Sequence, residues 1–354
     1  MRAPLVLAAA AALAVPAGAA TAAPRLQSPS LARIAAAPAF VADSTLAAPK
    51  ASRLLLRGAY WGGRYTTPSG DAVTVYVSDS YAQDPAIPQR WADFLSSLVH
   101  GTELGLVTAY LAPLDEVQTI CGADALACYS PQQSLLVAPG DAPAADISAE
   151  AVVTHEYGHH VAAHRSDAPW AAVDYGTKRW ASYMEVCRRT RSGELYPGAE
   201  SIPNYELNPG EAFAETYRLL NQRREGVMET PWDIVDQSLY PTSQALALVE
   251  QDVTAPWTKA ATTTYRSSLS AQTRARTFSV ATALDGTLGL TVRIGAVRAR
   301  VRVTTASGAS VADRTLAARH AATVRTTICG QRSYSVRVAR VRGAGAVTLT
   351  VTRP

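Results

Sequence analysis

Hydrophobic and polar positions divide this chain into a part that mixes strands with helices and a later part that contains strands only. In the first part, alternation predicts a strand at residues 73–77, and apolar runs predict strands at 106–111 and 134–137. Helical patterns cover residues 88–98, 147–164, 177–189 and 233–250. The first part is therefore expected to be an α+β domain, with a core that includes Trp180, Tyr183 and Leu246.

From about residue 272 the pattern changes to short β-rich runs separated by glycine or turn residues. The runs cover residues 288–294, 297–303, 323–328, 334–341 and 346–351. This rhythm is typical of an all-β sandwich. The predicted boundaries are 54–262 for the mixed domain, 263–275 for a linker and 276–354 for the sandwich, a division that suits a chain of 354 residues.

The N-terminal segment has the pattern of an export signal. A basic residue, an apolar run and small residues at 1–23 predict a secretory signal peptide with cleavage after Ala19 or Ala22. Residues 24–53, rich in Ala, Pro and Ser, are expected to be a flexible leader or short propeptide. No later stretch approaches about 18 apolar residues, so the mature chain is expected to be secreted without a membrane span. An uncleaved N-terminal anchor is the alternative.

The strongest chemical signal is the H-E-x-x-H motif at residues 155–159, within the helix predicted at 147–164. His155 and His159 are four residues apart and share a helix face, so both imidazoles can bind one Zn²⁺. Glu156 would then point towards the water on the metal. Gly158, which is unfavourable inside a helix, could let another backbone pass close to this site.

A catalytic zinc usually has a third protein ligand, which must come from elsewhere in the chain. The extended form of the motif would need a histidine at position 165, where the chain has Arg165. His160 and His164 are out of phase and are interpreted as helix-surface histidines or as residues beside the ligands.

A second helix, predicted to start at Asn208 and Pro209, offers a different ligand. Glu211 and Glu215 lie four residues apart on one face of it. One carboxylate can bind the metal while the other accepts a hydrogen bond from a ligand imidazole. The alternative is a capping box at Glu211 with Glu215 as a solvated surface charge.

Together, the motif at 155–159 and the segment 211–218 (EAFAETYR) resemble the gluzincin metallopeptidases, and among them the protease domain of anthrax lethal factor. The resemblance covers about 70 residues. It implies a zincin-like catalytic domain, followed here by the all-β sandwich, whose strand rhythm and stretch 343–351 are similar to bacterial pre-peptidase C-terminal domains. Residues 129–137 would then form the edge strand along which a peptide substrate lies, paired through its main chain.

The same resemblance implies roles for individual residues. His155, His159 and Glu211 would be the zinc ligands, Glu156 the general base, and Glu215 the partner of a ligand. Tyr205 is the nearest match for the tyrosine that helps to stabilise the oxyanion. Without the resemblance, Tyr205 is an ordinary loop tyrosine.

Four cysteines suit an oxidising compartment. Cys121 and Cys128 enclose a short loop that a disulfide could close. Cys187 and Cys329 either form a second bridge or remain separate thiols. A zinc-cysteine site is the competing interpretation, but the spacing matches no standard cluster.

Charge separates the two parts of the chain. Residues 271–354 contain fourteen arginines and two aspartates, a net charge of +12, whereas the other residues carry 19 basic and 27 acidic side chains, a net charge of −8. In the run 297–303, Arg298, Arg300 and Arg302 alternate with apolar residues and form a row on one strand face. A looser row contains Arg337, Arg340 and Arg342.

Three interpretations of the basic face remain open: a solvated sheet surface, a patch that binds an anionic polymer of the cell envelope, or a surface that docks onto the acidic domain. Nucleic acid is not expected, because no aromatic-studded binding motif is present.

Two functions of different classes follow. The first is a secreted zinc metalloendopeptidase that acts on a peptide or protein substrate, with Glu156 as general base. The second is an envelope- or polyanion-binding protein whose metal site is structural or inactive. A zinc hydrolase acting on a non-peptide amide is a smaller third alternative.

Overall fold

The structure, a computed structural model, describes residues 60–330 and 332–354. The predicted signal peptide at 1–23 and the predicted leader at 24–53 lie outside the described residues. Within the described ranges, no helix is both long enough and apolar enough to cross a membrane.

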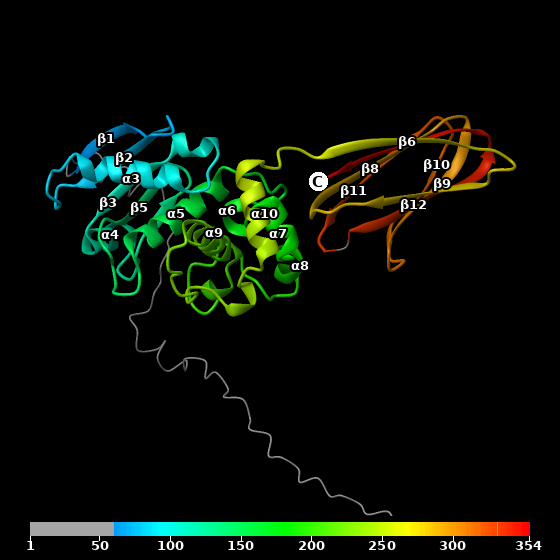
Figure 1. The fold of residues 1–354 in the computed structure, drawn as a ribbon. Helices are drawn as coiled ribbons and strands as arrows, with labels where there is room; N and C mark the ends of the chain where they lie inside the picture. Colours follow the sequence, from blue (N-terminus) through cyan, green and yellow to red (C-terminus); the bar gives the residue numbers. More distant parts are fainter. Residues whose placement is uncertain (1–59, 331) are drawn as a thin grey trace, which may run out of the picture. The chain divides into compact units, whose positions relative to one another are not determined.

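A five-stranded sheet begins the described chain, in the order β1-β2-β3-β5-β4 (Figure 1). Its strands are β1 (Tyr60–Thr66), β2 (Ala72–Ser78), β3 (Thr108–Ala112), β4 (Cys128–Ser130) and β5 (Leu135–Pro139). The pairs β2–β3 and β3–β5 are parallel, and the two edge pairs are antiparallel. Parallel strands need crossovers, which α3 (Ala86–Ser97), the 3-10 helix η1 (Thr102–Leu106) and α4 (Leu114–Cys121) provide.

Helices cover both faces of this sheet. The alternating residues Val73, Val75 and Val77 of β2 share one core with α3 and α5 (Ala149–Ala163), while α4 packs with β5 on the other face. Every residue of β5 is buried, as expected for a strand inside a parallel sheet. The strands predicted at 73–77, 106–111 and 134–137 and the helix at 88–98 are thus confirmed.

The prediction that residues 129–137 form one edge strand is wrong. A turn with Ser134 at a positive φ of 50° reverses the chain, so that β4 and β5 pair antiparallel. Only the three residues of β4 lie at the edge, and all three are buried. This edge offers little main chain to a peptide.

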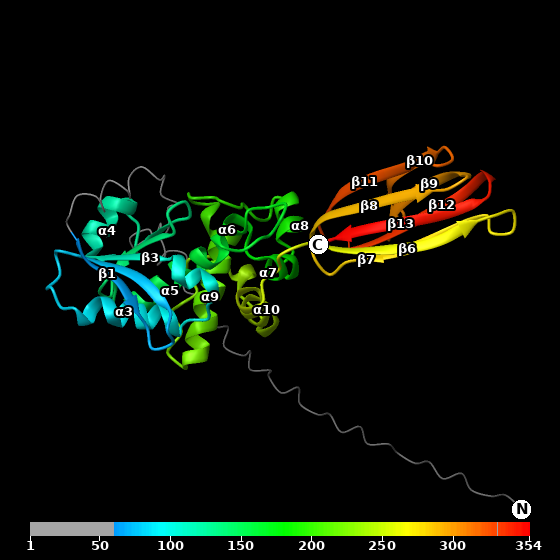
Figure 2. The ribbon, with the colours of Figure 1, turned by 90° about the horizontal axis from the view of Figure 1, so that it is seen from above.

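A helix-rich region follows the sheet (Figures 1 and 2). It contains α6 (Ala172–Tyr175), α7 (Lys178–Tyr183), α8 (Val186–Arg191), η2 (Tyr205–Leu207), α9 (Pro209–Glu225), η3 (Gln237–Leu239) and α10 (Ser243–Thr254). The helix predicted at 177–189 is broken into α7 and α8, because Glu185 adopts a left-handed conformation. The helix predicted at 233–250 begins only at Ser243, since Thr242 caps it after Pro241.

Core predictions for this region are confirmed for Trp180 and Leu246, which are buried. Tyr183 is an exception, because 40% of it is exposed. Its hydroxyl lies 2.9 Å from Oγ1 of Thr242.

Two four-stranded antiparallel sheets form the C-terminal β region, in the orders β10-β9-β12-β7 and β11-β8-β13-β6. The strands are β6 (Ala261–Leu269), β7 (Ala275–Ala281), β8 (Gly286–Ile294), β9 (Val297–Thr305), β10 (Ser310–Leu316), β11 (Ala321–Ile328), β12 (Ser333–Gly343) and β13 (Gly345–Arg353). Buried residues from both sheets form one shared core. The predicted strand runs are therefore present, and the region is all antiparallel.

Most of the segment 263–275, predicted as a linker, is strand β6. It pairs along its whole length with β13, and Tyr265 packs against the core of the β region. The strand was not predicted because polar residues occur on both of its faces. Thr262, Thr264 and Ser268 are exposed, and Thr263 and Ser267 are half-buried on the face that carries Tyr265.

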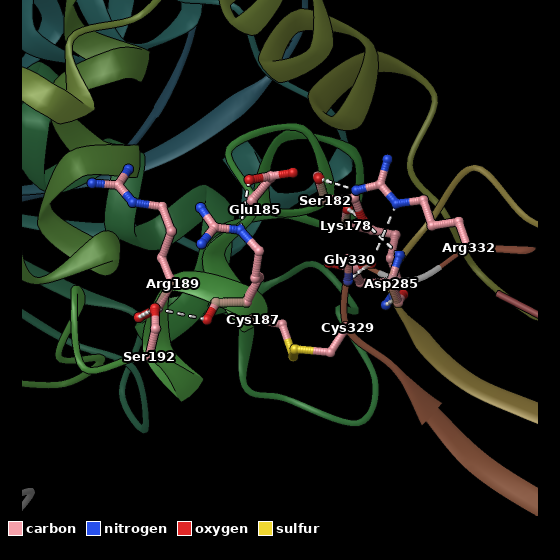
Figure 3. The surroundings of a disulfide bond; sticks show 11 residues. Lys178, Ser182, Glu185, Cys187, Arg189, Ser192, Asp285, Cys329, Gly330 and Arg332 are labelled. Atoms are coloured by element: carbon pink, nitrogen blue, oxygen red, sulfur yellow. Dashed lines mark hydrogen bonds and ion pairs between the residues drawn. A yellow bond between two sulfur atoms is a disulfide. The ribbon is translucent and has the colours of Figure 1, made fainter. Parts of the chain in front are cut away.

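A disulfide and a polar cluster join the helix-rich region to the β region (Figure 3). The bond between Cys187 and Cys329 links residues that are 142 positions apart. Beside it, Nζ of the buried Lys178 donates to the main-chain oxygen of Asp285 at 3.0 Å. Nη2 of Arg332 donates to the main-chain oxygen of Ser182. The alternative of separate thiols is wrong, and so is a zinc-cysteine site, because Cys121 and Cys128 also form a disulfide.

Candidate metal centre

Helix α5 orients the two histidines of the H-E-x-x-H motif. It begins where Ser148 accepts a hydrogen bond from the main-chain nitrogen of Ala151 at 3.0 Å, and it runs without a break to Ala163. Both His155 and His159 are only 4% exposed. The predicted helix and the shared face of its two imidazoles are present.

Helix α9 supplies the carboxylates. Asn208 caps it by accepting from the main-chain nitrogen of Gly210 at 2.9 Å, and Pro209 occupies the first turn. Glu211 is 5% exposed and Glu215 is fully buried. Glu215 is therefore not the solvated charge of the alternative interpretation.

Gly158 brings the two helices together. A Cβ atom at this position would lie 2.9 Å from Cα of Ala214 and 3.2 Å from its main-chain oxygen. A side chain would push α9 away from α5. The unfavourable glycine inside α5 thus allows another backbone to approach the site closely, as the sequence suggested.

Three ligand atoms converge where the helices meet. Nε2 of His155 lies 3.3 Å from Oε2 of Glu211, Nε2 of His159 lies 3.5 Å from the same oxygen, and the two nitrogens are 3.2 Å apart. This buried group could hold a metal ion. A tetrahedral ion with bonds of about 2.0–2.2 Å separates its ligand atoms by about 3.3–3.6 Å, which is close to the triangle formed here.

The donor set narrows the choice of metal. Two imidazoles and one carboxylate suit zinc and neighbouring transition metals, whereas calcium and magnesium prefer oxygen ligands. A triangle of three ligands also leaves one tetrahedral position for another group.

Glu215 fixes the orientation of His155. Its Oε1 lies 2.8 Å from Nδ1 of His155, so a proton on Nδ1 leaves Nε2 free to bind a metal. Arg218 holds the carboxylate in turn, with Nε 2.8 Å from Oε1 and Nη2 2.5 Å from Oε2. Burial alone would raise the pKa of Glu215, but the charge and hydrogen bonds of Arg218 lower it to about 2.

The same contacts set the protonation of the group without a metal. Burial opposes a charged imidazole, yet the hydrogen bonds to Glu211 and Glu215 raise the pKa of His155 to about 10. The neighbouring histidines hold the pKa of Glu211 well below its usual range, against the effect of burial. A proton therefore compensates the carboxylates until a metal ion replaces it.

Glu156 and one proposed ligand, His155, border the same pocket. Its lining also includes Glu215 and Arg218. Apolar side chains such as Ile147, Val152 and Ile234 line much of the remainder. Glu156 itself is 2% exposed.

Tyr205 also reaches the group. It lies in η2, is 2% exposed, and its hydroxyl donates to Oε2 of Glu211 at 2.9 Å. The structure thus brings this tyrosine to the proposed ligand, and the hydroxyl is engaged with that carboxylate.

His160 and His164 lie outside the ligand group. Nδ1 of His160 is 3.0 Å from the hydroxyl of Tyr129, and its Nε2 is 2.9 Å from the main-chain oxygen of Glu103. Burial lowers the pKa of His160 to about 4, which keeps the ring neutral. His160 is therefore a buried structural residue rather than the helix-surface histidine of one interpretation.

Arg218 was not predicted as a site residue. Its guanidinium also bonds to Gln222 at 2.6 Å and to the main-chain oxygen of Thr230 at 3.2 Å, so it links Glu215 to the pocket wall. The signal was present in the spacing, because a residue three positions after Glu215 shares its helix face.

Comparisons with known proteins do not identify a family. The sequence matches no family profile, and no curated protein matches it. Structural similarity extends to the pre-peptidase C-terminal domain of a Bacillus anthracis collagenase, at 17% identity over 25% of this chain and 87% of that one, with a TM-score of 0.22. A mitogen derived from Yersinia pseudotuberculosis gives 6% identity over 27% and 87%, with a TM-score of 0.21.

A third structure is the capsular polysaccharide assembling protein CapF from Staphylococcus aureus. It is 8% identical over 70% of this chain and 74% of its own, with a TM-score of 0.19. At such TM-scores none of these likenesses carries an argument about fold or function.

Proposed function

We propose that this protein is a secreted zinc metalloendopeptidase. The observation that supports the proposal is the buried triangle of His155, His159 and Glu211, with Glu156 next to a ligand in the same helix and bordering the same pocket. The mixed sheet followed by α5 and α9 supports a zincin-like domain. Two disulfides indicate an extracellular or otherwise oxidising compartment, which agrees with export.

In this proposal His155, His159 and Glu211 would hold the zinc ion, which would supply Lewis-acid activation of water and of the scissile carbonyl. Glu156 accepts the proton of the attacking water on its carboxylate and delivers it to the leaving nitrogen. Tyr205 donates a hydrogen bond to the developing oxyanion once its hydroxyl leaves Glu211. Glu215 keeps Nδ1 of His155 protonated, and Arg218 holds Glu215 in place.

The pocket supports a substrate with an apolar side chain. Ile147, Val152 and Ile234 would remove such a side chain from water, at roughly 25 cal/mol for each Å² of apolar surface buried. The short, buried edge strand β4 makes main-chain pairing with the sheet a minor part of recognition.

The decisive experiment measures bound zinc and cleavage of an unfolded protein substrate by the full chain and by Glu156→Gln. The proposal predicts one zinc ion in both proteins, with cleavage reduced by about 100-fold to 10,000-fold in the variant. Cleavage that does not depend on Glu156 would overturn it.

A structural metal site is the second candidate, because none of the three proposed ligands is more than 5% exposed. In that case zinc binds, no peptide or other amide is cleaved, and chelation lowers the melting temperature. A zinc hydrolase that acts on a non-peptide amide would differ from the endopeptidase in its substrate. It would turn over a small amide in a Glu156-dependent reaction and would not cleave the protein substrate.

A further inference from the structure

The outer face of the sheet β10-β9-β12-β7 carries an unusual density of arginines. In β9, Val297, Ala299, Val301 and Val303 are buried, so that Arg298, Arg300 and Arg302 all point to solvent. Arg337 and Arg342 of β12 are also exposed. We call these five residues, Arg298, Arg300, Arg302, Arg337 and Arg342, the arginine face.

Strand register places four of them in opposing pairs. Arg302 is directly opposite Arg337, and Arg298 is opposite Arg342. A register shift between Arg340 and Arg342 brings Arg342, rather than its neighbours, to that position. Like charges directly opposite each other destabilise a sheet, so these pairs favour a bound anion between them.

One acidic side chain, Asp313 of β10, partly neutralises this face. Arg300 binds it through two contacts of 2.7 Å, and Nε of Arg302 lies 3.1 Å from Oδ2. No ion pair within residues 60–330 and 332–354 involves Arg298, Arg337 or Arg342. The contacts of Asp313 therefore show that neighbouring arginines of this row can bind one anionic group together. The guanidinium groups of Arg298, Arg337 and Arg342 have no acidic partner in the described chain.

Within residues 60–330 and 332–354, the bonds between the β region and the helix-rich region do not involve the arginine face. The contacts that join the β region to the helix-rich region come from Asp285, Cys329 and Arg332 (Figure 3). Among the residues that the structure describes, no hydrogen bond at this junction comes from the arginine face, which leaves the face available to a partner.

The outer face of the other sheet differs. Its arginines, Arg266, Arg293 and Arg325, stand opposite Thr348, Thr348 and Gly289 rather than opposite one another. Both faces thus carry three arginines without an acidic partner in the described chain, but only the arginine face presents them in pairs with further arginines.

The described residues place no aromatic ring on the arginine face, which narrows the chemical class of polymer that could bind there. Tyr334 is 6% exposed, and Phe278 packs against the core, so neither ring lies on the arginine face. Recognition of bases or neutral sugars usually uses aromatic stacking. Guanidinium forks suit phosphate oxygens, and two forks can enclose one phosphate.

We propose that the arginine face binds a phosphodiester polymer without bases, such as a polyol phosphate chain of a cell envelope. The two opposing pairs lie four residues apart on β9, about 13 Å, with Arg300 between them. A flexible glycerol phosphate chain laid along β9 can place alternate phosphates at the two pairs, because successive phosphates lie too close together to span this distance. Such binding does not require the proposed catalysis.

The test compares two triple variants of the full chain that remove equal charge from opposite faces. One is Arg298→Gln, Arg337→Gln and Arg342→Gln, and its matched control is Arg266→Gln, Arg293→Gln and Arg325→Gln. The probe is fluorescently labelled poly(glycerol phosphate), with binding measured by anisotropy at several salt concentrations. Far-UV circular dichroism verifies that both variants are folded.

We expect the first variant to bind about tenfold or more weakly and with a smaller salt dependence, and the control to stay within about twofold of wild type. Equal losses in both variants would show that net charge alone attracts the polymer, and would overturn the proposal. So would an absence of binding to wild type. Tighter binding of a single-stranded oligonucleotide or of polyglutamate would also overturn it, in favour of a nucleic acid or a carboxylate polymer.

Discussion

The charged side chains around the proposed ligands His155, His159 and Glu211 differ from those of the arginine face in burial and in their partners. Around His155, charged side chains are buried and each one is held by a hydrogen-bonded partner, as Arg218 holds Glu215. On the arginine face, charged side chains are exposed and three of them have no acidic partner in the described chain. A buried charge without a partner costs several kcal/mol, whereas water compensates an exposed charge at almost no cost.

This difference divides the proposed functions. Compensated, buried groups keep a fixed geometry, which metal binding and catalysis require. Exposed, uncompensated groups can adapt to an external partner and attract it over a distance. Substituting matched residues in the two regions tests whether burial governs the distinction.

The largest effect is expected from removing a ligand. Glu211→Ala should weaken zinc binding by about 100-fold or more, because two histidines alone hold the ion poorly. Equilibrium dialysis with metal analysis measures the affinity. Glu206→Ala changes an exposed glutamate in the neighbouring 3-10 helix and is the control. Equal zinc binding by both variants would contradict the site.

A buried and an exposed arginine should respond differently to the same substitution. Arg218→Met leaves the carboxylate of Glu215 buried without its guanidinium partner and with only His155 to hold it, and we expect a loss of about 3–5 kcal/mol in the free energy of unfolding. Arg337→Met should leave stability unchanged or slightly higher, because it removes a like-charge pair with Arg302. Urea unfolding with a chelator present measures both. Similar changes in the two variants would remove the proposed distinction.

The junction between the regions should depend on its disulfide. Replacing Cys187 and Cys329 by serine together should destabilise the protein by about 2–4 kcal/mol, since the bond closes a long loop in the unfolded chain. Replacing Cys121 and Cys128, which enclose a much shorter loop, should cost less. The melting temperatures of both double variants, measured under oxidising conditions, test the order. A larger loss of stability on replacing Cys121 and Cys128 would show that loop length does not decide how much each disulfide stabilises the protein.

Low pH should destabilise the folded protein, because the buried carboxylate of Glu215 becomes protonated. Its pKa is lowered from 4.5 to about 2, so the folded state binds fewer protons than the unfolded state between these values. The stabilisation is complete above about pH 5 and is lost as the pH falls towards 2, up to about 3 kcal/mol. Unfolding at several pH values, with a chelator, should show a shallower acid dependence in Glu215→Gln. An unchanged acid dependence would assign it to other carboxyl groups.

Neutralising an exposed carboxylate, Asp313, should have the smallest effect on stability. The hydrogen bonds of Arg300 and Arg302 lower the pKa of Asp313 to about 2, but its pair with Arg300 is open to solvent. Exposed ion pairs contribute little and are screened by salt. Asp313→Asn should leave the melting temperature unchanged at physiological salt and should strengthen polyanion binding, because it frees Arg300. A large loss of stability would show that the face is not solvated as described.

The sequence by itself determined local features. The spacing of His155 and His159, the cap and proline that start α9, the alternation in β9 and the short disulfide loop each depend on residues close together in the chain. Periodicity, capping and loop closure act over such short distances, so the sequence pattern is enough to predict them. The proposed ligand Glu211 also came from sequence, but through its helix signal and a family resemblance rather than through contact.

Only the tertiary structure decided the rest. It placed Glu211 within 3.5 Å of both histidines, brought Ala214 against Gly158, buried Glu215 beside Arg218, and joined Cys187 to Cys329. It also split residues 129–137 into two strands and turned the polar segment after Ala261 into β6. These outcomes depend on packing between distant segments, and no local pattern specifies which distant side chain will satisfy a buried charge or cover an apolar face.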